Sequence, residues 1–346
     1  MKIVKEKEIS FKDDKIVVIK LVNKNNLEIK FSNYGATLLS ILVPDKEGEK
    51  IDITIGRNNI EDYLENHDLP EKYYFGCTVG RFANRIAKGQ FAIAGKVFLL
   101  SQNEGKNHLH GGFKGLHKVT WDYKINEDQN EIMFSYLSPD GDEGYPGNFK
   151  IELSVSLNDL NEIRFKYKAT TDKATPVSLT NHAYFNLNGG KSSILNHRIH
   201  INSDFFLEND KYGIPTGKLI PVAKTNYDFS IAKNLSDSEI MQNEGYDKCY
   251  VLNKLERRFE FAGSIREINN PISLEVYTSE PSLQLYTANA FDGSFKGKNG
   301  VLYSKFHGVC MEAQRFPDSP NHNNFPSSIL YPGEVYEQET IYKIQF

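Results

Sequence analysis

The sequence contains 346 residues, of which 39% are hydrophobic and 25% charged, and its formal net charge at pH 7 is −4. This composition supports a large apolar core, and the slight negative charge argues against nucleic-acid and anionic-membrane partners, which require a basic surface. No apolar run is long enough to cross a bilayer, and the charged N-terminal residues lack the hydrophobic segment of a signal peptide. The three cysteines, Cys77, Cys249 and Cys310, have unrelated spacings that suggest neither disulfides nor a zinc site, so we expect a cytoplasmic protein.

Apolar residues recur at every second position in most segments, and Gly, Asn, Asp and Pro cut these segments short, which is typical of β-strands. In chain order the pattern predicts strands at residues 15–22, 27–31 and 37–43, a short helix at 60–64, strands at 91–100, 131–136, 151–157 and 163–169, a second short helix at 237–243, and strands at 272–277, 282–287 and 336–344. The clearest hairpin joins 151–157 to 163–169, because the apolar residues of both segments are all odd-numbered. The predicted class is therefore all-β with few short helices.

Two long polar loops, residues 138–147 and 315–321, interrupt the strands, and loops held on a sheet scaffold often carry function. The sequence shows no internal repeat, low-complexity tract or linker that would mark a domain boundary. All-β sandwiches of this length can form one domain. We therefore expect a single large antiparallel β-sandwich domain over residues 1–346.

Polar side chains lie beside glycine or aromatic residues in four segments, at residues 80–88, 107–112, 180–187 and 308–321. In the first segment, Asn84 and Arg85 could donate hydrogen bonds to a ligand, Arg85 through a planar fork of N–H groups. The alternative for Arg85 is an ion pair with a surface carboxylate.

His108 and His110 in the second segment are two residues apart, which on a strand would place both on one face, where they could bind a transition metal with a distant carboxylate. No third ligand has a motif-like spacing, and Gly111 and Gly112 indicate a loop where the backbone approaches a ligand closely. We therefore expect no metal, with the histidines serving as hydrogen-bond donors or acids instead.

His182 and Glu312 are the candidates for proton transfer. His182 follows a predicted strand end at 177–179, and histidine, with an unperturbed pKa of about 6.5, can give and take a proton near neutral pH. Glu312 ends an apolar run, with Gln314 on the same face of the predicted strand, and partial burial would raise its pKa toward the range of a general base. The alternatives are a core histidine bonded to backbone and a surface acid at a strand end.

Asp247 enters a further apolar strand, and Gln284 lies inside another. Carboxylate and amide groups can each bridge two neighbouring sugar hydroxyls. Either residue could equally be a strand cap or a solvent-facing position.

Together these segments resemble the aldose 1-epimerase (galactose mutarotase) family, from about Phe31 to the C-terminus. The resemblance rests on GRFANRIAKG at 80–89, NHLHGG at 107–112, DGDEGYPG at 140–147, TNHAYFNL at 180–187 and EAQRFPDSPN at 312–321, which follow the family's order and approximate spacing. It implies a galactose mutarotase-like supersandwich that takes an aldose substrate and uses neither a metal nor an organic cofactor.

The resemblance also implies the residues of the site. Glu312 would be the general base, His182 the general acid and His110 a supporting histidine, while Asn84, Arg85, Asp247 and Gln284 would hold hydroxyl groups. The chemistry asks for such a pair, because an anomer inverts when its C1 hydroxyl loses a proton and its ring oxygen gains one. Whether His110 shares the acid role stays open, as do the preferred aldose and a monomeric or homodimeric state.

Three other functions are compatible with parts of the sequence. A hexose-6-phosphate 1-epimerase would need more cations near the motifs than Arg81, Arg85 and Arg315. A glycosidase would pair Asp247 with Glu312 as two carboxylates and would give the histidines no role. A non-catalytic sugar-binding module would need no proton-transfer pair at all.

Overall fold

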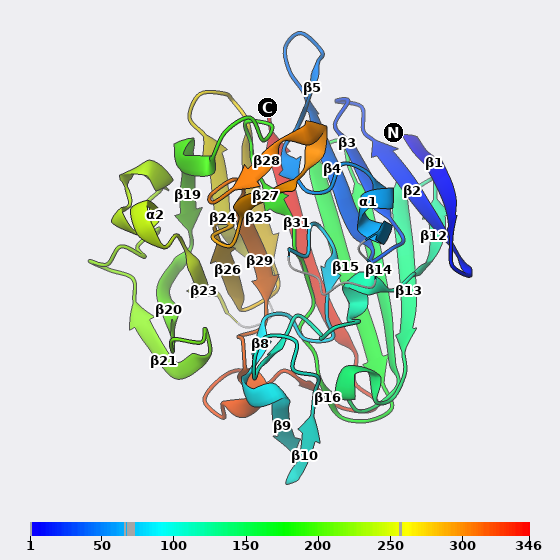
Figure 1. Ribbon diagram of the computed structural model, residues 1–346, viewed down its shortest axis with the longest axis vertical. Helices are drawn as coiled ribbons and strands as arrows, with labels where there is room; N and C mark the ends of the chain where they lie inside the picture. Colours follow the sequence, from blue (N-terminus) through cyan, green and yellow to red (C-terminus); the bar gives the residue numbers. More distant parts are fainter. Residues whose placement is uncertain (1, 66, 68–72, 256–257) are drawn as a thin grey trace.

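A computed structural model describes residues 2–65, 67, 73–255 and 258–346, and strands dominate it (Figure 1). Within these residues the α-helices are α1 (Ile60–Glu65) and α2 (Glu239–Asn243), both near their predicted positions. The all-β prediction is confirmed. No helix in this part of the chain is long and apolar enough to cross a membrane.

The largest sheet forms one side of the molecule, and all of its pairings are antiparallel. In spatial order its strands are β12 (Asp122–Asn126), β13 (Glu131–Ser138), β14 (Phe149–Leu157), β15 (Glu162–Thr171), β31 (Tyr336–Gln345), β25 (Ser273–Thr278), β24 (Glu260–Glu267), β19 (His197–Ile201) and β22 (Lys233–Asn234). The predicted hairpin is β14 and β15, where Leu157 lies opposite Ile163. Its odd-numbered side chains face the core because successive residues of a strand point to opposite sides.

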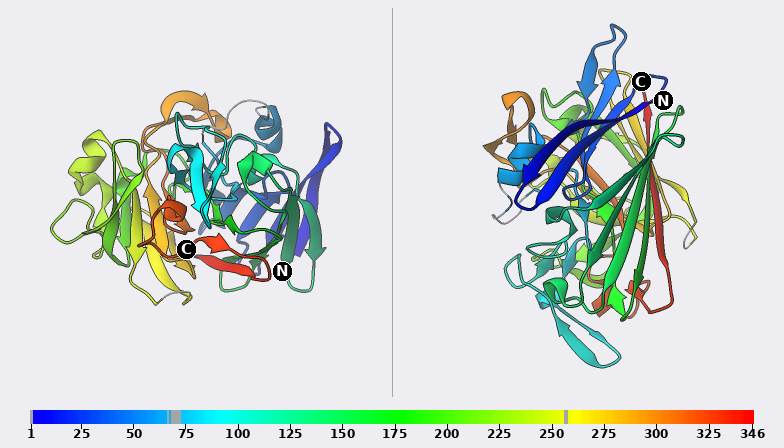
Figure 2. Two further views of the ribbon diagram at one scale, coloured as in Figure 1. Left: turned by 90° about the horizontal axis from the view of Figure 1, so that it is seen from below. Right: turned by 90° about the vertical axis from the view of Figure 1, so that its right-hand side faces the viewer.

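A second antiparallel sheet packs against the first. It contains β1 (Lys2–Phe11), β2 (Asp14–Val22), β3 (Glu28–Ser32), β4 (Thr37–Pro44) and β5 (Lys50–Asp52). Figure 2 shows the two layers from the side, and the ring of Phe31 lies 6.3 Å from Phe134 and 5.9 Å from Phe165 between them. Burial of these apolar faces holds the layers together.

A third antiparallel sheet contains three of the predicted site residues. Its strands are β21 (Pro215–Pro221), β20 (Ser203–Asn209), β23 (Asp247–Leu252), β26 (Ser282–Tyr286) and β29 (Cys310–Gln314). Gln284 lies opposite Glu312 on one side and Cys249 on the other, and Tyr286 lies opposite Asp247. Opposite residues share a face, so this register places Glu312, Gln284 and Asp247 on one surface.

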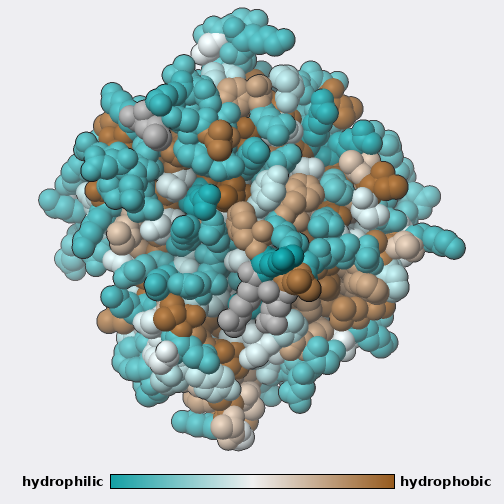
Figure 3. Space-filling model, turned by 180° about the vertical axis from the view of Figure 1, so that it is seen from behind, coloured by the Kyte–Doolittle hydropathy of each residue, from teal (hydrophilic) through white to brown (hydrophobic). Residues whose placement is uncertain are grey.

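Two-stranded ladders lie outside the three large sheets. They pair β6 (Thr54–Ile55) with β18 (Tyr184–Phe185), β7 (Thr78–Val79) with β17 (Thr180–Asn181), β8 (Arg85–Ile86) with β11 (His108–Leu109), β9 (Gln90–Ile93) with β10 (Lys96–Leu99), β16 (Thr175–Pro176) with β30 (Ile329–Leu330), and β27 (Asp292–Lys296) with β28 (Leu302–Ser304). The single strand predicted at 91–100 is wrong, because Ala94 and Gly95 have positive φ angles of 49° and 79° and turn the chain between β9 and β10. Hydrophilic side chains dominate the face in Figure 3, with hydrophobic ones in small groups among them.

Candidate active site

A pocket of about 390 Å³ opens above β23, β26 and β29, and its walls bring the predicted site residues together. All seven line it: Asn84, Arg85, His110, His182, Asp247, Gln284 and Glu312. Its size suits a small polar ligand. The predicted grouping of these residues is therefore what the fold produces.

Glu312 lies on β29 at the base of the pocket and is only 2% exposed. Burial raises its pKa well above the ordinary value of 4.5, and the charge of Asp247 raises it further. Its Oε2 atom has no hydrogen-bond donor among the described residues. A buried carboxylate with a raised pKa and an open oxygen is suited to accept a proton from a ligand.

His182 lies between β17 and β18 and is buried at the pocket wall. Its backbone N–H donates to the Cys77 carbonyl at 3.0 Å, and its carbonyl accepts from the Gly76 N–H at 2.9 Å. The side chain extends to the carboxylate, with Nε2 of His182 3.6 Å from Oε2 of Glu312. A proton donor and a proton acceptor thus lie side by side.

His110 forms the adjacent wall, with its ring centroid 5.2 Å from that of His182. The backbone N–H of Asn84 donates to Nδ1 of His110 at 3.1 Å, so the hydrogen of the neutral ring is on Nε2. Burial lowers the pKa of His110 well below 6.5, and nearby His182 and Arg85 lower it further. His110 is therefore a neutral hydrogen-bond donor.

The expectation that His108 and His110 share a face is wrong. Strand β11 ends at Leu109, and His110 has a φ of 51°, which turns its side chain away from the line of the strand. His108 is instead fully buried, with Nδ1 2.7 Å from the Ser101 carbonyl and Nε2 2.7 Å from the hydroxyl of Tyr145. Both of its nitrogens have structural partners.

Charged and amide groups complete the rim. Arg85 donates from Nε and Nη2 to Glu104, each at 2.7 Å, and its Nη1 lies 3.9 Å from Oδ2 of Asp247. Burial lowers the pKa of Arg85, but the Glu104 hydrogen bonds and the charges of Asp247 and Glu104 outweigh burial and raise it overall. Gln284 donates from Nε2 to Oδ1 of Asp247 at 2.5 Å. Arg85 thus pairs with a carboxylate, but inside the pocket rather than on the open surface.

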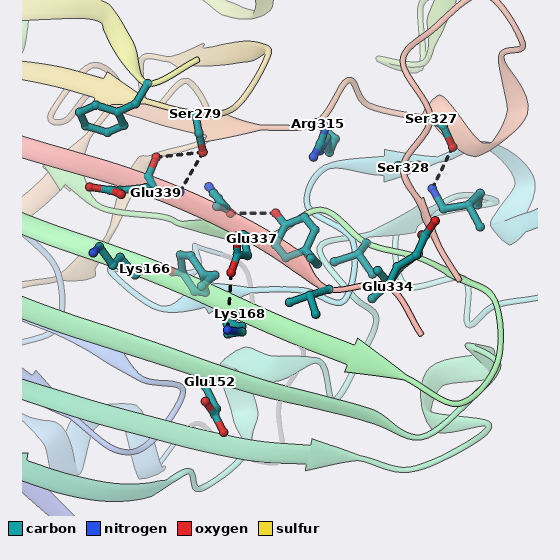
Figure 4. A pocket seen from close by; sticks show the side chains of 18 of the residues that line it. Glu152, Lys166, Lys168, Ser279, Arg315, Ser327, Ser328, Glu334, Glu337 and Glu339 are labelled. Atoms are coloured by element: carbon teal, nitrogen blue, oxygen red, sulfur yellow. Dashed lines mark hydrogen bonds and ion pairs between the residues drawn. The ribbon is translucent and has the colours of Figure 1, made fainter. Parts of the chain in front are cut away.

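The other two arginines of the motifs lie outside the pocket. Arg81 is buried and donates to the carbonyls of Ser138, Pro139, Pro146 and Gly147, which holds the 138–147 loop in place. Arg315 lines a separate open cavity of about 820 Å³ (Figure 4) and pairs with Glu280 at 3.2 Å. Other charges of that cavity also pair, as Lys168 does with Glu337 at 3.5 Å. Of the three arginines, only Arg85 reaches the site.

The two long polar loops, residues 138–147 and 315–321, support segments of the pocket wall. Glu143 of the 138–147 loop accepts hydrogen bonds from the backbone N–H groups of Phe113 and Lys114, next to the Gly111–Gly112 turn. Asp318 of the 315–321 loop accepts from the Ala87 N–H and donates its own N–H to the Arg85 carbonyl. Both loops thereby fix the segments that carry His110 and Arg85.

The pocket is also lined by residues that the sequence analysis does not single out as site residues: Tyr74, Glu104, Tyr184, Tyr286 and Asn289. Tyr74 adopts a positive φ of 53°, and its ring lies 4.7 Å from that of His110. The aromatic run at 73–75 could have indicated a wall of the pocket, whereas nothing around Glu104 predicts its pairing with Arg85.

One atom each of His110, His182 and Glu312 lie within 4.8 Å of one another, a spacing at which a metal ion could be considered. The hydrogen bonds of these side chains do not suit a metal ion. The Asn84 N–H donates to Nδ1 of His110, which leaves the hydrogen of the neutral ring on Nε2, so neither nitrogen of His110 is open to a metal. The surroundings favour proton transfer over metal binding.

An antiparallel sandwich with a buried carboxylate beside an imidazole, surrounded by groups that bind hydroxyls, defines an acid–base enzyme for polyhydroxylated ligands. Comparison with known proteins agrees. The family model for aldose 1-epimerases matches residues 17–343. The galactose mutarotase of Mus musculus is 39% identical over 327 residues, which cover 93% of this chain and 92% of that protein.

The aldose 1-epimerase of Escherichia coli K12 is 34% identical over 333 residues, 94% of each chain. A crystal structure of an aldose epimerase homologue from C. elegans matches with a TM-score of 0.86 at 31% identity, covering 94% of this chain and 98% of that one. The chain therefore belongs to the aldose 1-epimerase family, which places it among the sugar mutarotases.

Proposed function

We propose that this protein interconverts the α and β anomers of hexopyranoses such as galactose and glucose, with Glu312 as general base and His182 as general acid. The observation that supports it best is the distance of 3.6 Å between Nε2 of His182 and Oε2 of Glu312, at the base of a pocket lined by hydroxyl-binding groups. The C1 hydroxyl and the ring oxygen of a pyranose are attached to one carbon, so their proton donor and acceptor must also be neighbours.

The reaction proceeds through the open-chain sugar. Glu312 takes the proton of the C1 hydroxyl while His182 gives a proton to the ring oxygen, and the C1–ring oxygen bond breaks to leave the aldehyde. After rotation about the C1–C2 bond, Glu312 returns its proton to the carbonyl oxygen and His182 takes back the other as the ring closes. Each positioned proton-transfer group contributes typically 10²- to 10⁴-fold to such a reaction.

The remaining residues orient the sugar. Neutral His110 donates from Nε2 near the reacting end, and Asn84 and Arg85 donate to hydroxyl oxygens, since a guanidinium has only donors. Asp247 accepts from hydroxyl groups, and Gln284, whose Nε2 is bonded to Asp247, offers its amide oxygen. Preorganised donors and acceptors of this kind reduce the entropy lost on reaching the transition state.

The other functions receive less support. Arg81 and Arg315 point into other parts of the fold, which leaves Arg85 and its carboxylate partners as a poor site for a sugar phosphate. A glycosidase would leave unexplained why a histidine lies 3.6 Å from the buried base. A binding module would have no use for a carboxylate with a raised pKa.

Polarimetry on freshly dissolved α-D-galactose and α-D-glucose tests the proposal. We expect the protein to accelerate mutarotation of both sugars, and a metal chelator should leave the rate unchanged. With glucose as the substrate, galactose should inhibit more strongly than glucose 6-phosphate. A chromogenic glycoside should not be cleaved. Mutarotation at the buffer rate would overturn the proposal, and strong competition by the sugar phosphate would favour the phosphate-specific function.

Replacing His182 tests the assignment of the acid. His182→Asn should lower kcat by about 10²-fold or more and change KM little, because the proton is transferred only in the reaction step. An unchanged kcat, with a large loss in His110→Asn instead, would transfer the acid role to His110.

We further propose a cytoplasmic protein, monomeric or homodimeric, whose single domain carries the whole site.

A further inference from the structure

Cys310 is fully buried beside His182. Its sulfur lies 3.6 Å from Nδ1 of His182, within the range of hydrogen bonds to the large sulfur atom. Cys310 is two residues before Glu312 on β29, so both side chains lie on the same face of the strand. His182 therefore has Cys310 at one ring nitrogen and Glu312 at the other.

The plane of the His182 ring is fixed independently of these two contacts. The ring stacks on Tyr184 with centroids 5.0 Å apart and planes 27° apart, and on Tyr74 at 5.9 Å and 21°. The backbone of His182 is held on both sides by hydrogen bonds to Gly76 and Cys77. With the plane fixed, the groups at its edge determine where the ring hydrogens lie.

The proposed reaction places a specific demand on that edge. Nε2 must lose a proton to the ring oxygen and take it back when the ring closes. A neutral imidazole has one N–H and one acceptor nitrogen, so Nε2 can take the proton back only if Nδ1 keeps its hydrogen. The group next to Nδ1 must therefore accept a hydrogen bond.

We propose that Cys310 is a positioning residue whose sulfur accepts a hydrogen bond from Nδ1–H of His182, so that Nε2 alone carries the transferred proton. The inference rests on the proposed function, because the demand of that reaction on Nε2 sets the direction of this hydrogen bond. The tautomer of His182 is a property of the protein without substrate.

An uncharged partner suits an acid that must release its proton. Burial raises the pKa of Cys310 well above 9.0, and the charges of Glu312 and Asp247 raise it further, so the sulfur stays neutral. A carboxylate at this position would stabilise the imidazolium and oppose proton release, whereas a neutral sulfur is a weak acceptor that orients the ring. His110 shows the opposite arrangement, because the Asn84 N–H donates to its Nδ1 and leaves it a donor at Nε2.

Three variants and one control test the role of Cys310. Cys310→Val and Cys310→Ala remove the acceptor, the first with a side chain of similar size, and Cys310→Ser restores an acceptor. Cys249 is an equally buried thiol on β23 that does not line the pocket, so Cys249→Ala controls for loss of a packed sulfur. Two quantities are measured: kcat and KM by polarimetry, and the ¹⁵N shifts of the neutral His182 ring, assigned by comparison with His182→Asn.

In the wild type we expect Nδ1 of neutral His182 to carry the hydrogen. Cys310→Val and Cys310→Ala should move part of the population to the Nε2–H tautomer and lower kcat roughly three- to tenfold, as expected for one ordinary hydrogen bond, with KM within about twofold. Cys310→Ser should keep the wild-type tautomer, and Cys249→Ala should change neither quantity.

Unchanged ¹⁵N shifts in both Cys310→Val and Cys310→Ala would overturn the proposal, as would equal losses of kcat in Cys310→Ala and Cys249→Ala. If one Cys310 variant does not fold, the other gives the same readout. A wild type without mutarotase activity would contradict the proposed function but would leave the tautomer measurement to decide the role of Cys310.

Discussion

Charge and burial together set the proton affinity of Glu312. Burial is the larger cause of its raised pKa, and the Asp247 carboxylate adds to it because a second negative charge disfavours ionisation. A general base acts only when deprotonated, so kcat/KM should fall as the pH drops through the pKa of Glu312. Removing the charge of Asp247 should lower that pKa and shift this acid limb to lower pH.

The test compares pH profiles of kcat/KM for Asp247→Asn and Asp247→Glu. Asp247→Asn should show the shifted limb together with a higher KM, since Asp247 also binds hydroxyls in our account. Asp247→Glu keeps the charge and should keep the limb near its wild-type position. An acid limb that stays in place in Asp247→Asn would show that Asp247 has no influence on the base.

Sequence patterns single out seven residues that the structure brings into one pocket, but they do not show the partners of these residues. His182 and Glu312 lie in short segments where polar residues stand beside glycine or aromatic residues, so the sequence singles them out as candidate proton carriers. Their partners come from distant parts of the chain, as with Glu104 and Arg85 or Cys310 and His182. A left-handed residue such as His110 also reverses the orientation that strand periodicity predicts for it.

A tight turn at Gly111 holds the neighbouring residue His110 at the wall of the pocket. The φ of Gly111 is 85°, and an added Cβ would lie 1.7 Å from the Gly80 carbonyl oxygen. Gly95, in the β9–β10 turn, has a similar φ of 79° but open space around it. Gly95→Ala should therefore cost only the roughly 1 to 2 kcal/mol of a left-handed alanine, whereas Gly111→Ala must also displace backbone beside His110.

Urea unfolding and polarimetry separate the two effects. Gly111→Ala should lose more stability than Gly95→Ala and should also lose activity, because the adjacent His110 moves. Equal stabilities and wild-type activity for the two variants would contradict the tight packing of Gly111 against Gly80.

Elements with a clear period of two were predictable, and elements without it were not. In the strands β14, β15, β25 and β31 every second residue is buried and most of the others are partly or fully exposed, so their positions follow from the sequence. Strand β1 is largely exposed and charged, which gives it no apolar period. The sequence predicts one strand in place of the β9–β10 hairpin, because the alternation of apolar residues continues on both sides of the turn.

The molecule as a whole is built around one continuous hydrophobic cluster. It includes Ile19 of β2, Leu153 of β14, Ile265 of β24 and Met311 of β29. Since the cluster joins all three large sheets, we expect calorimetry to show one unfolding transition with equal calorimetric and van't Hoff enthalpies. Two resolved transitions would instead indicate separate domains.

The class of fold followed from the sequence, but the arrangement of its sheets did not. Periodicity shows which face of a strand is buried, yet it does not say that β31, at the end of the chain, pairs between β15 and β25. Nor does it predict that β23, β26 and β29 align their polar residues in register. Such pairings depend on contacts between residues far apart in the chain.

One substitution tests directly whether Glu312 takes the proton of the C1 hydroxyl. Glu312→Gln keeps the size of the side chain and removes the base, so polarimetry with fresh α-D-galactose should show kcat lowered by about 10²- to 10⁴-fold, while calorimetry still detects galactose binding. Glu280→Gln, which alters a buried carboxylate outside the pocket, should retain mutarotation. Near-wild-type mutarotation by Glu312→Gln would contradict the role of Glu312 as general base.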